Sequence, residues 1–104
     1  MPPEPDPTST PVRRTLALSS AMEDYVRAIY VRGGDEAAVM TTALARDLDV
    51  APASVTGMVK RLHAMGLVHH ERYAGVQLTD IGRKVALEIV RHHRLIETFL
   101  AEAL

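Results

Sequence analysis

The sequence predicts a small, mainly α-helical domain that contains one short β-hairpin. Its 104 residues are enough for one domain with a modest core and too few for two. Hydrophobic residues make up 47% of the chain but aromatic residues only 4%, so aliphatic side chains must build most of the core. Beyond residue 20 the apolar residues follow helical spacing along most of the chain and alternate in one short segment, which indicates helices with a single hairpin.

The first 19 residues are predicted to form a disordered tail. Five of the six prolines lie within residues 1–12, where apolar residues are scarce, so this segment cannot bury enough surface to offset the entropy of ordering. Ordered structure is predicted to begin near Ser20, because Ser20 and Glu23 have the spacing of a capping box. The first helix is predicted to end at the glycine pair Gly33-Gly34.

Residues 40–66 are predicted to form two short helices joined by a tight turn, which is the pattern of a helix-turn-helix. The hydroxyl of Thr41 or Thr42 is expected to cap the first of these helices. Pro52 suits the first turn of the second helix, since the N–H that proline lacks has no partner there. One apolar stripe on the second helix consists of Val55, Met58, Val59 and Leu62.

The opposite face of the second helix is suited to DNA. It is small and hydroxylated near the N-terminus and cationic further along, so it can approach base edges while its cations meet phosphates. Residues 51–94 carry seven Lys and Arg against three Asp and Glu, although the whole chain has a net charge of −1. A helical hairpin with an ordinary solvated surface is the alternative interpretation. The residues of this pair predicted to contact DNA are Thr41, Thr42, Ala51, Pro52, Ala53, Ser54, Thr56, Gly57, Lys60 and Arg61.

Residues 67–78 are predicted to form a two-stranded hairpin, because the apolar period changes there from helical to alternating. Gly75 in the turn can adopt a positive φ. The hairpin would be a wing, and Arg72 and His70 near its tip are predicted to contact phosphate. His69 and His70 are adjacent on a strand and point to opposite faces, so they are not expected to share a metal ion.

Thr79 is predicted to cap a long helix with its hydroxyl. The apolar stripe over residues 81–100 widens beyond what the other elements can cover, and the chain ends without a stop signal, so residues 80–104 are interpreted as a linking helix of a longer protein. His93 and Glu97 lie four residues apart on one face of this helix and could hold a divalent ion. An ordinary solvated contact between them is the alternative.

Composition excludes several other classes of protein. The chain has no cysteine, hence neither a disulfide framework nor a thiolate metal site. No apolar run approaches the roughly 18 residues that span a bilayer, and no signal peptide is visible, so we expect a cytoplasmic protein without a membrane partner. An enzyme is not expected, because no nucleophile and base have a suggestive spacing and no glycine-rich phosphate loop is present.

The order of these elements resembles the N-terminal half of the diphtheria-toxin-repressor-like metalloregulators, which are iron- or manganese-dependent repressors. The matching phrases are MEDYVRAIY, VAPASVTGMVKRL, GLV, YAGVQLTDIGR and RHHRLIETFL, and the likeness covers residues 20–100. The resemblance implies a winged helix-turn-helix DNA-binding domain over residues 20–79, with Pro52–Met65 as the recognition helix and 67–78 as the wing. It also implies repression of metal-uptake genes by a homodimer on a pseudo-palindromic operator.

The resemblance implies a metal site that contains Asp24, His93 and Glu97. Asp24 stands where manganese-type members have an aspartate ligand, which favours Mn(II) over Fe(II). His93 matches the family's histidine ligand from the long helix, and Glu97 matches the acid that many members use one turn later.

The chain also departs from the family pattern. Arg27 replaces a glutamate of some manganese-type members, and Gly57 replaces a longer side chain on the recognition helix of others. The remaining metal ligands and the dimerisation helices are expected beyond Leu104, the last residue of the sequence. We therefore expect this chain to bind Mn(II) or Fe(II) only weakly.

Two other functions stay open from the sequence alone. One is a winged-helix repressor that responds to a small organic effector, since the L-T-x-x-G entry to the helix after the wing occurs there too. The other is a winged helix that binds only another protein. Exposed acidic residues on the recognition helix would have favoured this protein-binding function. The helix carries the basic residues Lys60 and Arg61 instead, which do not favour it.

Overall fold

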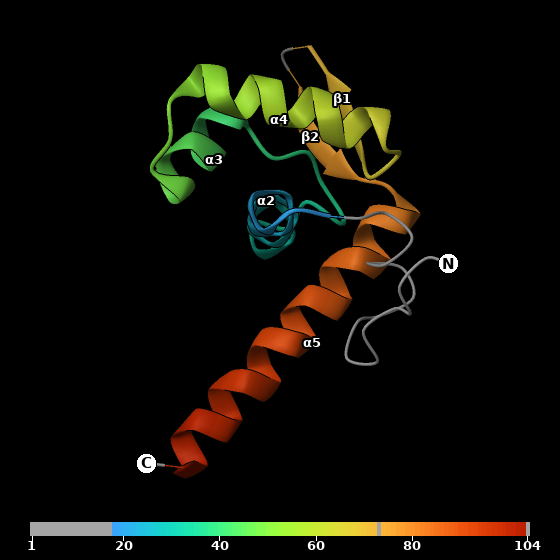
Figure 1. Ribbon diagram of the computed structural model, residues 1–104. Helices are drawn as coiled ribbons and strands as arrows, with labels where there is room; N and C mark the ends of the chain where they lie inside the picture. Colours follow the sequence, from blue (N-terminus) through green and yellow to red (C-terminus); the bar gives the residue numbers. More distant parts are fainter. Residues whose placement is uncertain (1–17, 73, 104) are drawn as a thin grey trace, which may run out of the picture.

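The computed structural model describes residues 18–72 and 74–103, and for residues 93–103 it describes only the helical backbone. Figure 1 shows α4 lying beside the hairpin, α2 packed beneath α3 and α4, and α5 running away from them towards the C-terminus. The predicted fold class is confirmed. The elements in chain order are α2 (Ser20–Val31), α3 (Thr41–Leu48), α4 (Pro52–Ala64), β1 (Val68–Glu71), β2 (Gly75–Leu78) and α5 (Asp80–Ala103).

The start of α2 differs from the prediction by one residue. Ser19, not Ser20, is the N-cap, and its Oγ accepts a hydrogen bond from the Met22 N–H at 3.2 Å. Leu18 packs against the core. Two residues of the predicted tail therefore belong to the folded domain, while the prediction of disorder for residues 1–17 falls outside the described residues. The C-terminal end of α2 is as predicted, with Gly33 at a φ of 85°.

The start of α3 corrects the expected threonine cap. Met40 occupies the N-cap position and no side chain caps the helix, because Thr41 is already the first helical residue. The carbonyl of Met40 accepts the N–H groups of Ala43 and Leu44 at 3.1 and 3.3 Å. Pro52 is the first residue of α4, as predicted, so its missing N–H removes no helical hydrogen bond.

An aliphatic core lies between α2, α3, α4, α5 and the hairpin. Its fully buried side chains include Val26, Ile29, Leu44, Val55, Val59, Leu62, Leu67, Val76, Val85 and Ile89. The apolar stripe of α5 starts later than predicted, since Ile81 is 52% exposed. Gly82 takes the inner position of this first turn, where a Cβ would lie 1.9 Å from the Leu67 carbonyl oxygen. The close approach of α5 to the turn between α4 and β1 therefore requires glycine, and Ile81 faces outward.

The hairpin pairs β1 and β2 in antiparallel register from Val68 opposite Leu78 to Glu71 opposite Gly75. Val39, before α3, adds an isolated bridge to the outer edge of β2: Val39 and Val76 exchange N–H···O bonds of 2.7 and 2.8 Å. Gly75 has the predicted positive φ, at 101°, and a Cβ there would also lie 2.4 Å from the Val39 carbonyl oxygen. The bridge to Val39 was not predicted. Within the described part of the chain, no helix is long and apolar enough to cross a membrane.

Candidate nucleic-acid interface

The turn between α3 and α4 sets the direction of the second helix. Asp49 follows α3 in a left-handed conformation with a φ of 53°, which aspartate tolerates better than most side chains. The Val50 N–H donates to the Ala45 carbonyl at 3.0 Å, and Val50 packs against the core. The chain then enters α4 at Ala51, which has an extended backbone and is exposed.

The predicted DNA-contacting residues of α4 lie on its solvent-exposed side. Val55, Val59 and Leu62 are fully buried, so the opposite face of the helix is directed away from the core. The exposed residues are Ala51, Pro52, Ala53, Ser54, Thr56, Gly57, Lys60 and Arg61. The helix therefore has small and hydroxylated residues in its first half and cations in its second half.

The other predicted contacts lie on neighbouring elements. Thr41 is half-buried and Thr42 is exposed in the first turn of α3, which packs against α4. Neither hydroxyl is used to cap α3. Arg72 and His70 are both exposed at the distal end of the wing. The structure therefore gathers the predicted residues onto the helix-turn-helix and the wing.

Gly57 leaves an open space in the middle of the exposed face. A Cβ at this position would meet no heavy atom within 4 Å, so the fold does not require glycine here. Gly57 lines a groove between α4 and the start of α2, together with Ala21, Tyr25, Val50, Ala53, Ser54, Met58 and Arg61. The missing side chain therefore affects what can approach α4, not how α4 packs.

The hydroxyl of Thr56 is partly engaged by its own helix. Its Oγ1 donates to the Pro52 carbonyl at 3.2 Å. The oxygen keeps lone pairs that can accept a hydrogen bond from a base, and the methyl group can contact a thymine methyl. Ser54 is exposed closer to the start of α4.

An ion pair removes one negative charge from the surface of α3. Arg32, which follows α2, donates from Nε and Nη2 to the two carboxylate oxygens of Asp47, both at 2.5 Å. The hydrogen bond from Arg32 holds the pKa of Asp47 below its usual range, so this carboxylate stays ionised and paired. The pair was not predicted, because it joins residues 15 apart in the sequence and no local pattern links Arg32, which follows α2, to Asp47 of α3.

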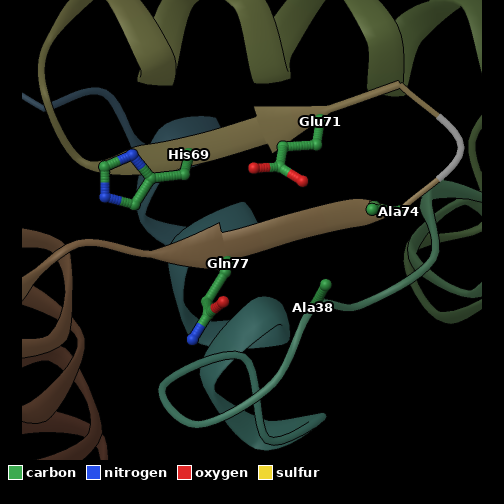
Figure 2. Close-up of a pocket in the computed structure, with 6 residues that line it drawn as sticks. Ala38, His69, Glu71, Ala74 and Gln77 are labelled. Atoms are coloured by element: carbon green, nitrogen blue, oxygen red, sulfur yellow. The ribbon is translucent and has the colours of Figure 1, made fainter.

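One face of the wing lines a small pocket (Figure 2). His69 and Glu71 of β1 and Gln77 of β2 lie around a small pocket of about 160 Å³, which Ala38 closes from the segment before α3. His69 and Glu71 are two residues apart and share this face, whereas His70 does not line the pocket. The alternation predicted for the two histidines is therefore observed.

The candidate metal site is described only in part. Asp24 is exposed on α2, which packs against α5. The side chains of His93 and Glu97 lie outside the described residues, but α5 is helical through both positions, so the four-residue spacing is kept. Among residues with described side chains, no three His, Cys, Asp or Glu gather as a metal cluster.

The rest of the predicted metal site is not tested by the structure. Leu104, beyond which the remaining ligands are expected, itself lies outside the described residues. A site built from two carboxylates and one imidazole therefore stays a prediction. Its donors are ones that suit Mn(II) or Fe(II).

A helix-turn-helix with an exposed basic second helix, followed by a hairpin wing, defines a winged-helix DNA-binding protein. Residues 17–76 match the family model of the iron dependent repressor N-terminal DNA binding domain. Residues 79–104 match that of the iron dependent repressor metal binding and dimerisation domain. The chain therefore belongs to the iron dependent repressor family, and the resemblance found in its sequence is confirmed.

Relatives with transcription-regulator names support this assignment. The chain is 39% identical over 88 residues to the uncharacterized HTH-type transcriptional regulator MJ0568 of Methanocaldococcus jannaschii, covering 84% of this chain and 70% of that protein. It is also 39% identical over 80 residues to the HTH-type transcriptional regulator MntR of Oceanobacillus iheyensis, covering 77% of this chain and 54% of MntR. The crystal structure of ScaR with bound Zn2+ superposes with a TM-score of 0.66 at 36% identity, over 79% of this chain and 38% of ScaR. The chain thus spans little more than half the length of MntR.

Proposed function

We propose that this chain is the DNA-binding part of a repressor that controls metal-uptake or metal-homeostasis genes in response to Mn(II) or Fe(II). The observation that carries the proposal is the exposed, small and cationic face of α4 in a member of the iron dependent repressor family. The match of residues 79–104 to a metal binding and dimerisation domain, and the zinc-bound structure of ScaR, support a divalent metal as the effector. We expect the repressor to act in the cytoplasm.

In the proposed complex, α4 enters the major groove. Ala53 and Gly57 allow the helix backbone to approach base edges, and Ser54 and Thr56 supply hydroxyls for bases or phosphates. Lys60 and Arg61 are exposed in the second half of α4, and both neutralise phosphates. The wing adds phosphate contacts from Arg72 on the flank of the same duplex.

Asp24 on α2, together with His93 and Glu97 on α5, would hold the metal. Carboxylate oxygens and imidazole nitrogen are ligands that Mn(II) and Fe(II) accept. A bound ion would supply positive charge that joins α2 to α5 and so fixes the angle between the DNA-binding helices and the long helix. Histidine must be neutral to ligate, so metal affinity would fall in acid.

The proposed functional unit on DNA is a homodimer. The match of residues 79–104 to a metal binding and dimerisation domain supports two copies acting together. Two-fold symmetric helix-turn-helix proteins read half-sites about one helical turn, or a multiple of it, apart, so a pseudo-palindromic operator is expected.

The test is selection of DNA by the chain from a random-sequence duplex library, followed by binding assays with MnCl2 or with EDTA. We expect enrichment of a defined sequence, strong salt dependence, and weak saturable binding of Mn(II) to the chain. A repressor that responds to an organic effector would enrich a sequence but show no binding of Mn(II) or Fe(II). A winged helix that binds only protein would enrich no sequence, and that result would refute the proposal.

A further inference from the structure

His63 connects the DNA-reading helix to the wing. It lies in the last turn of α4, and its Nδ1 is 3.0 Å from the carbonyl oxygen of Val68, the first residue of β1. A carbonyl oxygen can only accept a hydrogen bond, so Nδ1 must carry a proton for this contact to form. The contact therefore requires one particular tautomer of the neutral imidazole.

The register of the wing explains why the Val68 carbonyl needs a partner outside the hairpin. Residues of an antiparallel strand alternate between those bonded across the pair and those whose backbone groups point away. Val76 directs its N–H and its carbonyl to Val39, away from β1. Leu78, two residues on, has the same orientation and donates its N–H to Gly34 at 2.7 Å. Val68 is opposite Leu78, so its carbonyl also points away from β2.

The turn between α4 and β1 is anchored separately, at the start of α5. The Thr79 hydroxyl donates to the Gly66 carbonyl at 2.6 Å, and the Thr79 N–H donates to the Leu67 carbonyl at 3.0 Å. Those bonds fix the turn to α5 and do not involve a side chain of α4. The bond from His63 is different, because it links the wing strand directly to α4. His63 is exposed near the end of this helix, about one turn beyond Lys60.

We propose that His63 is a positioning residue, which sets the orientation of the wing relative to α4 so that both engage one duplex. The role rests on the proposed DNA-binding function and acts through the Val68 carbonyl, without contact between His63 and a base. Loss of the bond would leave a carbonyl at the base of a buried strand end without its partner, since the Val68 side chain is 1% exposed. The wing would keep its bonds to Val39 and Gly34 but lose its side-chain link to α4, so its position relative to α4 would be less well fixed and its phosphate contacts would weaken.

The first test is made on the wild-type chain without DNA. Long-range 1H–15N NMR spectra, recorded well above the unperturbed histidine pKa of about 6.5, report which ring nitrogen carries the proton. We expect the His63 Nδ1 to be protonated and Nε2 to be unprotonated. The opposite tautomer would overturn the proposal.

The second test compares two variants of similar size. His63→Asn keeps an N–H donor at the same number of bonds from the backbone, whereas His63→Leu has no donor. With the duplex selected by the wild-type chain, we expect His63→Leu to bind about tenfold more weakly and to lose about one unit of the salt slope, as for one lost phosphate contact. His63→Asn should keep the wild-type slope. Circular dichroism at the assay temperature checks that each variant is folded.

The outcomes separate this proposal from the proposed function. If both variants keep the wild-type salt slope, His63 does not position the wing. If both lose thermal stability equally with no change of slope, His63 has only a structural role, and the proposal is also wrong. If His63→Leu does not fold, the proposal is judged by the tautomer of His63 in the wild-type chain and by the salt slope of DNA binding by His63→Asn. If the wild-type chain selects no duplex, the proposed DNA-binding function fails, and so does this positioning role.

Discussion

Substitution of Gly57 is predicted to stabilise the domain and to weaken DNA binding at the same time. Gly57 lies in the middle of α4, and a Cβ there would meet no heavy atom within 4 Å. Glycine inside a helix costs about 0.8–1 kcal/mol relative to alanine, because the unfolded glycine backbone has more freedom to lose. Since the fold leaves the space open, Gly57→Ala should recover most of this free energy.

The expected gain is large enough to measure. One kcal/mol shifts the melting temperature of a domain of this size by about 4–8 °C, so we expect Gly57→Ala to melt about 3–7 °C higher by calorimetry. Gly57→Leu should show a similar rise, because leucine is also a strong helix former. The two variants thus match in helix propensity and differ in bulk.

DNA binding should respond to bulk instead. If α4 approaches base edges at Gly57, the added Cβ occupies contact space, and Gly57→Ala should bind the selected duplex about tenfold more weakly, or about 1.4 kcal/mol. Gly57→Leu should bind more weakly still. Fluorescence anisotropy at fixed salt gives both values. Higher melting temperatures with wild-type affinity in both variants would show that this face of α4 is not the DNA interface.

Three further predictions concern charge and metal. Lys60→Ala should weaken binding to every sequence similarly and lower the salt slope by about one unit, whereas Ser54→Ala should change sequence preference; an unchanged slope for Lys60→Ala would place this side chain outside the interface. Asp47→Asn should lower the melting temperature at neutral pH, and the difference should decline as the pH falls below the ordinary aspartate value of 3.8, because the ion pair depresses the folded pKa and its stabilisation is lost on protonation. A difference that persists in acid would show another cause. Asp24→Ala and His93→Ala should each weaken Mn(II) binding measured by calorimetry, and wild-type affinity in both would reject the proposed ligands.

The helices and the hairpin could be predicted because each depends on apolar spacing within one short segment. Their ends were less predictable. Ser19 and Ser20 are both good caps, and the spacing to Glu23 favoured the wrong one, since the bond is actually formed with Met22. At α3 the first hydroxyl lies one residue too late to cap, because the helix already begins at Thr41.

The exposed face of α4 could be predicted because it is the complement of one buried stripe. Contacts between distant segments carry no such local pattern. Val39 joins the wing only because the strand edge of Val76 is open to it, and Gly75 must be glycine for that bridge as well as for its φ. The bond from His63 likewise depends on the register of a hairpin that pattern alone does not fix.

Local charge, not the net charge of −1, governs how this chain meets DNA. At physiological ionic strength, interactions between exposed charges fade over about 8 Å, so phosphates respond mainly to the nearest side chains. Lys60 and Arg61 are exposed on α4 itself, while the carboxylate of Asp47 on the adjacent helix is paired with Arg32. The positive charges of Lys60 and Arg61 are therefore not offset by the carboxylate of Asp47. Binding that depends on these local cations should weaken as salt is raised, with a slope set by the number of phosphates they neutralise.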